Sequence, residues 1–373
     1  MSGIYLVRVR EKLGTAAIVV VLVVVWGGGF LWFKGDLHLP LLPDKGQPAA
    51  ASKKPVVKAP AVSKASPPTA SASAYDGTVT LAEERKPVDI NPEPRRPAPI
   101  ALPPIADFRM ATFNLLGASH TGGKGKDPGR ASGSARMGGA LELIRQSQVS
   151  VVGFQEMQGS QRSAFRSGAP GWDLYPGDSL GNSGENSIGW DKQVWDLVKP
   201  DSIAIPYFNG NARQMPYILL RNKATGVQAY FANFHNPADI RQFKHQQRFR
   251  TEAEGREIDL FNNLQRSEIP MFVTGDMNER EEFFCRVVGA TSLKAAAGGS
   301  VTGGSCQPPR PTQIDWILGS PDVVFDGYTI NRSELVRRTT DHPVVSAHVV
   351  VDSLKFKNSY APTAETTQTQ TTP

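Results

Sequence analysis

Several motifs that would assign an enzyme class are missing from this chain of 373 residues. It has only two cysteines, and neither lies in a CxxC pair or another zinc-like spacing, which argues against a thiolate metal site. HExxH, GxSxG and Cys–His arrangements are also missing, so zinc proteases and serine or cysteine hydrolases lose support. The glycine- and lysine-rich segment 117–133 never gives the GxxxxGK[ST] spacing of a phosphate-binding loop. The remaining candidates for chemistry are acid, amide and imidazole side chains.

One uncharged apolar run, TAAIVVVLVVVWGGGFLWF, occupies residues 15–33. It is long enough to cross a hydrocarbon core of ~30 Å as a helix. A cleaved signal peptide is the alternative, but the run is long for that role and no small-x-small cleavage site follows closely. Arg8, Arg10 and Lys12 precede it, which places the stub 1–14 in the cytoplasm. We therefore expect a single-pass cell-membrane protein whose folded domain is extracellular.

The segments on either side of that domain have little bulky apolar content. Residues 34–105 are dominated by Pro, Ala, Ser and Lys, and residues 353–373 form a polar tail of low complexity. Such stretches cannot offset the entropy of ordering the chain, so we expect a disordered, extended linker and a disordered tail. One folded domain is then predicted at 106–352.

Charge favours a polyanionic partner. The formal net charge is +6 and the pI is about 9.2, which suits nucleic acid or an anionic lipid surface. Several of the lysines belong to the stub and the linker, so the whole-chain figure overstates the basicity of the folded domain.

The two cysteines, Cys285 and Cys306, both fall in the domain expected outside the cell. In an oxidising compartment an even pair favours a disulfide, which would add about 3 kcal/mol to stability through the unfolded chain. Two buried free thiols are the alternative. Sequence does not supply the Cα separation that decides between them.

Apolar runs of strand length alternate with helical segments in the domain. Strands are predicted at 108–116, 149–155, 217–221, 227–235, 271–274, 313–318 and 344–351, with an antiparallel pair inside 187–206. Helical spacing predicts a helix at 134–146 and one long or two shorter amphipathic helices across 237–266. This order suits an α/β fold, a four-layer α/β/β/α sandwich of two packed mixed sheets with outer helices.

Polar side chains capable of chemistry follow the ends of most of these strands. They are Asn114, Gln155 and Glu156, His235, Asp276 and Asn278, Asp315, and Asp341 and His342. An α/β scaffold can bring such strand ends onto one rim. Oxygen ligands together with histidines are what metal-assisted hydrolysis of a phosphate ester requires.

The same residues resemble a known family. The ordered fragments TFN (112–114), QE (155–156), His235, GDMN (275–278), IDW (314–316) and DHP (341–343) are similar to the endonuclease/exonuclease/phosphatase superfamily. That superfamily includes deoxyribonuclease I-like nucleases, abasic-site endonucleases, sphingomyelinases and inositol polyphosphate 5-phosphatases. The segment ATFNLLGASHT (111–121) is particularly similar to the nuclease-like subunit of cytolethal distending toxins.

Phosphodiester hydrolysis requires a cation, because a water must attack phosphorus against negative charge. Mg²⁺ prefers a few hard oxygen ligands, with Mn²⁺ or Ca²⁺ as alternatives. Glu156 and Asp341 are the predicted metal carboxylates. Asn114 is expected to add an amide oxygen or to order a bound water.

The remaining residues of the set receive roles in proton transfer and phosphate binding. The resemblance implies that Asp315 holds His342, which would activate the water or stabilise the transition state as a cation. Asp276 is expected to handle a second proton or to orient the nucleophile, and His235 to complete an anion clamp. Asn278 and, more weakly, Arg213 are the predicted phosphate contacts.

The partner of His235 is a departure from the nuclease pattern. Related nucleases pair this histidine with a glutamate, and the matching segment here, SGENSIGW (183–190), offers Glu185, Asn186 or neither. The other histidines, His120, His245 and His348, are expected to have no catalytic role.

Together these patterns predict a divalent-metal-dependent phosphodiester hydrolase, in particular an exported, membrane-anchored endonuclease. Nucleic acid is the expected substrate, and the catalytic domain is expected to be monomeric with no protein partner. A sphingomyelinase-like or inositol-phosphate hydrolase of the same fold is the first alternative, since fold does not fix function. A non-catalytic binding module is the second.

Overall fold

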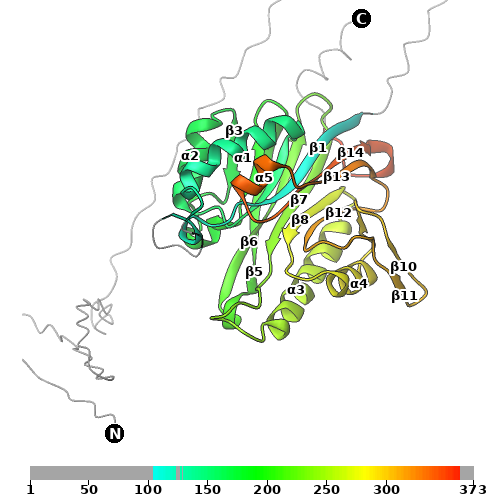
Figure 1. The fold of residues 1–373 in the computed structure, drawn as a ribbon. Helices are drawn as coiled ribbons and strands as arrows, with labels where there is room; N and C mark the ends of the chain where they lie inside the picture. Colours follow the sequence, from blue (N-terminus) through cyan, green and yellow to red (C-terminus); the bar gives the residue numbers. More distant parts are fainter. Residues whose placement is uncertain (1–103, 123–126, 128, 362–373) are drawn as a thin grey trace, which may run out of the picture. The chain divides into compact units, whose positions relative to one another are not determined.

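The computed structural model describes residues 104–122, 127 and 129–361 (Figure 1). The predicted transmembrane helix, nearly all of the linker and the tail beyond residue 361 lie outside these residues. In the part of the chain that is described, no helix has the length and hydropathy needed to cross a membrane.

Two six-stranded mixed sheets form the centre of the domain. The first has the order β13-β14-β1-β2-β4-β3 and the second β5-β6-β7-β8-β12-β9. The first sheet contains β1 (Ile105–Asn114), β2 (Val151–Gln155), β3 (Trp172–Tyr175), β4 (Ile188–Asp191), β13 (Val324–Asn331) and β14 (Val344–Asp352). The second contains β5 (Trp195–Pro206), β6 (Ala212–Asn222), β7 (Gln228–His235), β8 (Met271–Asp276), β9 (Lys294–Ala295) and β12 (Asp315–Gly319).

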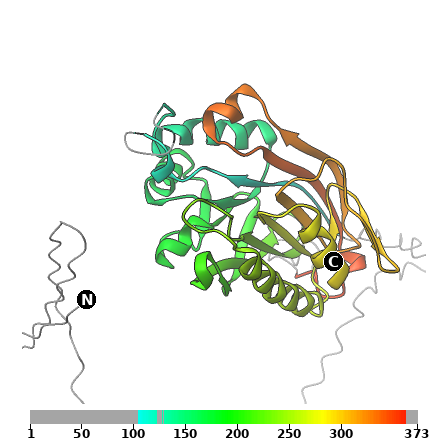
Figure 2. The ribbon, with the colours of Figure 1, turned by 60° about the horizontal axis from the view of Figure 1, so that its bottom comes forward.

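Helices cover the outer face of each sheet. Apolar side chains of the first sheet pack on α1 (Gly133–Ser147), α2 (Gly159–Gly168) and α5 (Glu334–Thr339). Those of the second sheet pack on α3 (Gln247–Gln265) and α4 (Glu281–Ala290). Figure 2 shows α1 and α3 on opposite sides of the two sheets. The predicted four-layer α/β/β/α sandwich is therefore confirmed for the described residues.

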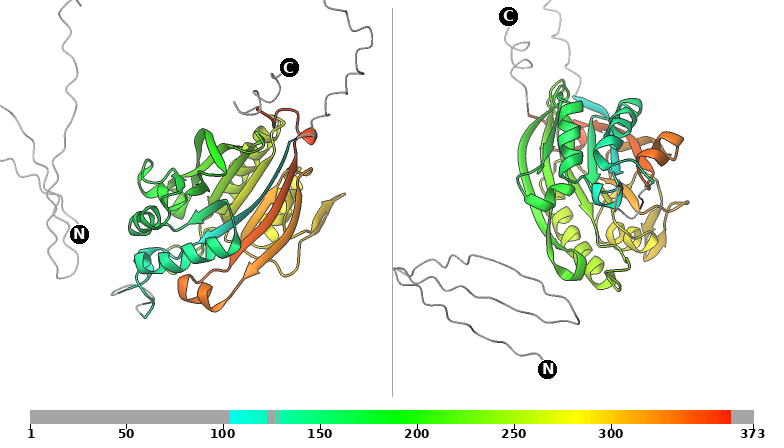
Figure 3. Two further views of the ribbon diagram at one scale, coloured as in Figure 1. Left: turned by 90° about the horizontal axis from the view of Figure 1, so that it is seen from above. Right: turned by 60° about the vertical axis from the view of Figure 1, so that its left-hand side comes forward.

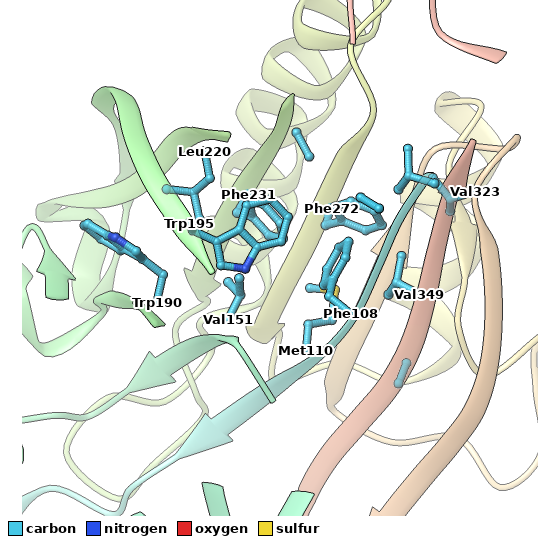
Figure 4. Packing of buried hydrophobic residues seen from close by; sticks show 14 of the residues in the cluster. Phe108, Met110, Val151, Trp190, Trp195, Leu220, Phe231, Phe272, Val323 and Val349 are labelled. Atoms are coloured by element: carbon cyan, nitrogen blue, oxygen red, sulfur yellow. The ribbon is translucent and has the colours of Figure 1, made fainter. Parts of the chain in front are cut away.

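Aromatic side chains fill the space between the two sheets. Phe108 of β1 meets Trp195, Phe231 and Phe272 of the second sheet edge to face, with ring centroids 5.0 to 5.9 Å apart (Figure 4). Each of these rings is at most 5% exposed. Burying so much apolar surface drives the sheets together, and the edge-to-face geometry adds to that burial.

A buried polar network joins the sheets close to their functional edge. Gln155 donates to Asn233 Oδ1 at 2.6 Å and to Thr112 Oγ1 at 3.1 Å, while Thr274 donates to Asn233 Oδ1 at 3.1 Å. Gly153 of β2 faces Thr274 and Asn233 of the second sheet, and a Cβ at this position would collide with both side chains. The four polar side chains are at most 3% exposed. Their mutual hydrogen bonds compensate the cost of burying them and fix how the sheets face each other.

Three sequence predictions need correction. The segment 187–206 does not form an antiparallel pair, because β4 joins the first sheet and β5 the second. Helix α3 begins only at Gln247, since 237–246 is an irregular loop in which Asp239 accepts from the backbone N–H of Gln246. The ordered domain also continues past residue 352, through η4 (Ser353–Lys355) to a bridge between Val227 and Tyr360.

The predicted disulfide is present. Cys285 of α4 and Cys306 are bonded, with their Cα atoms 5.6 Å apart. Cys306 lies in a hairpin of β10 (Ser300–Thr302) and β11 (Ser305–Gln307), which projects beyond the sheets (Figure 3). The bond therefore ties this hairpin to the helical layer, and the alternative of two free thiols is excluded.

Candidate active site

The register of the two sheets brings strand ends to one edge. Strands β1 and β2 run parallel, and their last residues pair with each other. In the other sheet His235 ends β7 beside Asp276 at the end of β8, and Asp276 also pairs with Asp315 where antiparallel β12 begins. His342 precedes β14, which runs antiparallel to β1 and so starts at the same edge. The polar residues after these strands therefore converge, although up to 228 positions separate them in the sequence (Asn114 to His342).

His342 is held by Asp315. Its Nδ1 lies 3.0 Å from both carboxylate oxygens of Asp315, whose side chain is 2% exposed. Burial alone lowers the pKa of His342, but the carboxylates of Asp315, Asp276 and Asp341 raise it to about 10. The Nδ1 proton is thus directed at Asp315, and Nε2 is the ring nitrogen left for chemistry.

Asp276 lies between two histidines. Its Oδ2 is 3.6 Å from Nε2 of His342 and 3.7 Å from Nε2 of His235. The same oxygen accepts a hydrogen bond from Asn114 at 3.0 Å, and Oδ1 accepts from the backbone N–H of Asn278 at 3.1 Å. Burial raises the pKa of Asp276, and the two histidines act in the opposite direction.

Glu156 occupies the end of β2 in an unusual backbone conformation. Its φ of 58° lies in the left-handed region, which a non-glycine residue adopts at a cost that often marks a functional constraint. Its two carboxylate oxygens accept from Asn114 Nδ2 at 3.1 Å and from the backbone N–H of Gly117 at 2.8 Å. Burial alone raises the pKa of Glu156, but His235 and these two donors lower it below its ordinary value. The result is an ionised carboxylate with a fixed orientation.

Of the two roles predicted for Asn114, an oxygen ligand or the ordering of a bound water, its amide is turned away from the first. Its Nδ2 donates to both Glu156 and Asp276, while its Oδ1 accepts from the backbone N–H of Leu116 at 3.0 Å. Asn114 therefore aligns two carboxylates that would otherwise repel each other. Direct metal ligation by its oxygen is not what this arrangement offers.

These strand ends open into a cleft. Its polar lining consists of His120, Asp127, Arg130, Glu156, His235, Asp276, Asn278, Asp341 and His342. Asp341 is exposed, and Asn278 has a φ of 52°, again left-handed. The Nδ2 of Asn278 donates to the carbonyl of Asn236 at 2.8 Å, which leaves its second N–H for a ligand.

The partner of His235 is neither Glu185 nor Asn186. The hydroxyl of Tyr207 lies 3.3 Å from His235 Nδ1, and Glu185 instead pairs with Arg213 at 3.3 Å. Arg213 lies 4.9 Å over the ring of Tyr207 and is not part of the cleft lining. Burial raises the pKa of Tyr207, so its hydroxyl stays protonated and can donate to Nδ1. Arg213 thus supports the histidine indirectly, and the predicted phosphate contact by Arg213 is not what the structure shows.

Sequence patterns also missed the basic residues beside the cleft. His120, for which the sequence predicted no catalytic role, lies 3.4 Å from Glu156 and lines the cleft. Arg136, 4% exposed, donates to the carbonyls of Leu115 and Leu116 after β1 and of Thr339 at the end of α5. The buried guanidinium of Arg136 thereby ties the loop after β1 to the loop after α5, which carries Asp341. The signal in the sequence for this role is that Arg136 lies beside Met137 on the buried face of the helix predicted at 134–146.

A family comparison agrees with this geometry. Residues 111–342 match the model of the Endonuclease/Exonuclease/phosphatase family, a span that is more than half of the chain and contains every residue of the site. The chain belongs to this family. A comparison with curated proteins found no significant match. The narrower similarity of 111–121 to cytolethal distending toxin subunits is not shown and stays a prediction.

Solved structures share the family fold at low identity. A family member from Bacteroides thetaiotaomicron has a TM-score of 0.53 at 18% identity, covering 66% of this chain and 99% of that chain. A mannosyl-6-phosphatase from the same organism scores 0.51 at 19% identity, covering 65% and 100%. The catalytic domain of human Nocturnin with bound sulfate scores 0.51 at 18% identity, covering 65% and 94%. Identities this low establish the fold only.

Members of this family are phosphate-ester hydrolases that typically depend on a divalent metal, and the donor set here fits such an ion. Four carboxylates line the cleft, while the described residues supply a single arginine, Arg130, which already pairs with Asp127. A phosphate anion would be repelled by this excess negative charge unless a cation reduced it. Asp276, Asp315 and His342 also offer ligand atoms within 4.8 Å of one another. The hydrogen bonds of His342 to Asp315 and its ion pair with Asp276 at 3.6 Å suit proton transfer better than metal ligation, which leaves Glu156 and Asp341 for the ion.

Directly behind the site lies a buried acid that none of these roles uses. Glu257 of α3 is 0% exposed, and neither carboxylate oxygen has a hydrogen-bond partner among the described residues. The neighbour of the Glu257 carboxyl is the side chain of Asn236, the residue after His235. The Oδ1 of Asn236 also lacks a hydrogen-bond partner among the described residues. Burial raises the pKa of Glu257 to about 8; the Asn236 side chain acts in the opposite direction, and the charge of Glu279 adds to the rise. A protonated Glu257 can donate to Asn236 and satisfy both groups.

Glu257→Gln is expected to stabilise the protein at alkaline pH. Because the folded pKa is about 8 and the ordinary value 4.5, the folded state keeps a proton that the unfolded chain releases. Stability should therefore fall as pH rises from 4.5 to 8, and glutamine should remove that loss, on the order of 5 kcal/mol at pH 8.5. Urea unfolding at pH 5 and pH 8.5 measures this. Glu252→Gln, an exposed acid on the same helix, is the control, and an unchanged pH dependence in Glu257→Gln would contradict the expectation.

Proposed function

We propose that this protein is a divalent-metal-dependent phosphodiester hydrolase, and specifically an endonuclease. The observation that carries the proposal is the convergence of the His342–Asp315 pair, Asp276 with His235, and an ionised Glu156 on one cleft. These groups supply what a phosphodiester needs: charge neutralisation, proton transfer on two sides and an oriented anion clamp.

Each side chain can be given a task from its contacts. Asp315 fixes the tautomer of His342, so that Nε2 faces the reacting phosphate and exchanges a proton or stabilises negative charge there. Asp276 orients the attacking water, with its Oδ2 3.7 Å from His235 Nε2. His235, held by Tyr207, and the free N–H of Asn278 bind phosphate oxygens.

The ion would be held by Glu156 and Asp341, with Mg²⁺ as the first choice and Mn²⁺ or Ca²⁺ as alternatives. Hard carboxylate oxygens are the ligands these cations prefer. Such an ion would supply Lewis-acid neutralisation of the phosphate charge. Asn114 supports the ion indirectly by donating to the Glu156 carboxylate.

We propose further that the domain is exported and tethered to the cell membrane through residues 15–33. That assignment rests on the uncharged run and on the basic residues before it. A protein that works in this setting would meet nucleic acid outside the cell.

The lipid hydrolase alternative has less support. An enzyme acting on a bilayer would be expected to expose apolar side chains beside its cleft. The exposed large apolar residues of the described chain are Ile105, Leu197, Val198, Val324, Leu354 and Tyr360, and none of them lines the cleft.

Plasmid nicking separates these functions. The full-length protein with Mg²⁺ or Mn²⁺ is expected to convert supercoiled DNA to the nicked form and to release no choline phosphate from sphingomyelin. EDTA should stop the reaction. Choline phosphate release without nicking would establish the lipid hydrolase instead. If the protein hydrolyses neither DNA nor sphingomyelin, a binding module is favoured.

A further inference from the structure

The loop that follows His235 and the first turn of α3 carry three permanent positive charges that no acid of the described residues neutralises. Arg241 and Lys244 lie in the loop, and Arg248 lies in the first turn of α3, 4.3 Å over the ring of Phe249. All three are exposed, and none forms an ion pair with an acid of the described residues. The one acid of the loop, Asp239, is taken by Arg250 at 2.6 Å and by the backbone N–H of Gln246. We call Arg241, Lys244 and Arg248 the basic arm.

The arm is carried by a well-fastened backbone. Phe243, between the first two cations, stacks on Phe208 with ring centroids 4.5 Å apart and planes at 14°. Gln246 donates to and accepts from the Asn209 segment, and Arg250 binds the carbonyl of Pro237 at 2.7 Å. The backbone that carries these charges is therefore held in place, which reduces the entropy of loop ordering lost when an anion binds.

The same loop forms one wall of the active-site cleft. Ala238 and Ile240, immediately before the arm, line the cleft together with His235. The cleft itself has an excess of carboxylates, so the sign of the local charge changes from negative inside to positive along the loop. A substrate with one small phosphate would not reach the arm. A chain of phosphates that passes through the cleft would.

We infer that the basic arm binds the backbone phosphates of nucleic acid next to the scissile phosphate. This inference rests on the proposed function and extends it, because it assigns a polymeric polyanion as the substrate class. Arginine and lysine contacts to successive phosphates release condensed counterions, so they contribute affinity without base specificity and in a salt-dependent way.

Binding measurements across salt concentrations test the arm without relying on turnover. The full-length protein and the variant R241Q/K244Q/R248Q are titrated with a fluorescein-labelled 20-nucleotide DNA in EDTA, by anisotropy between 50 and 200 mM KCl. The variant is expected to bind at least about 10-fold more weakly, and the slope of log K against log salt should become shallower by about 2. The matched control R145Q/K223Q/R256Q removes three cations that lie outside the cleft lining. It should change affinity by less than about 2-fold.

Two results would overturn the inference. One is an arm variant whose salt slope equals that of the control. The other is a loss of activity of the arm variant on bis(p-nitrophenyl) phosphate as large as its loss of DNA affinity. Because this diester is too short to reach the arm, that result would assign the effect to the cleft. Plasmid nicking keeps the two proposals apart: arm-dependent binding without nicking rejects the nuclease alone, and nicking with arm-independent binding rejects the arm alone.

Discussion

Replacing His342 with alanine is expected to lower kcat for phosphodiester hydrolysis by about 10³-fold, with a smaller change in KM. The ring is the only group of the site whose position is fixed by two 3.0 Å contacts to one buried carboxylate. Its loss removes a proton-transfer group and leaves Asp315 as an unpaired buried charge. Initial rates on bis(p-nitrophenyl) phosphate give kcat and KM separately.

The chain offers a matched control in the adjoining strand. His348 of β14 pairs with Asp107 and Asp326 on the surface, outside the cleft lining, and His348→Ala should leave kcat within about 2-fold. Asp315→Asn tests the positioning role, since an amide can still contact Nδ1 but no longer stabilises the imidazolium. Equal activity of His342→Ala and His348→Ala would remove His342 from the chemistry.

Glu156→Gln should raise the Mg²⁺ concentration needed for half-maximal activity by at least about 10-fold. Glutamine keeps the size of the side chain and the acceptor for Gly117, so the left-handed turn at the end of β2 should persist. The substitution removes the negative charge of the Glu156 carboxylate, which is held in its ionised form although burial alone would raise its pKa. Activity is followed over a Mg²⁺ titration, and excess metal is expected to restore part of kcat.

Glu142→Gln, on the exposed face of α1, is the charge-matched control. Circular dichroism of both variants shows whether the fold is intact. A Glu156→Gln enzyme with an unchanged Mg²⁺ requirement would place the ion elsewhere, with Asp276, Asp315 and His342 as the next set of ligands.

Local sequence patterns, together with the family resemblance, predicted the layers of the fold and the convergence of the polar strand ends on one edge. Strand-length apolar runs that end in an acid, amide or histidine predicted the edge on which Glu156, His235, Asp276 and His342 meet. The pairing of strands was less accessible, as β4 and β5 show. Only a three-residue connection separates them, yet each alternates like a hairpin partner and joins a different sheet.

The amino-acid sequence was enough to identify the chemical groups of the site, because hydrophobic periodicity and polar residues at strand ends are local properties that can be recognised without the fold. Tertiary structure alone decided how those groups are oriented. The hydroxyl of Tyr207 beside His235, the amide of Asn114 turned toward two carboxylates and the buried guanidinium of Arg136 are all contacts between distant segments. Their geometry follows from how the two sheets pack, because polar atoms buried between them must hydrogen-bond to one another, and the spacing of residues along the chain does not specify these partners.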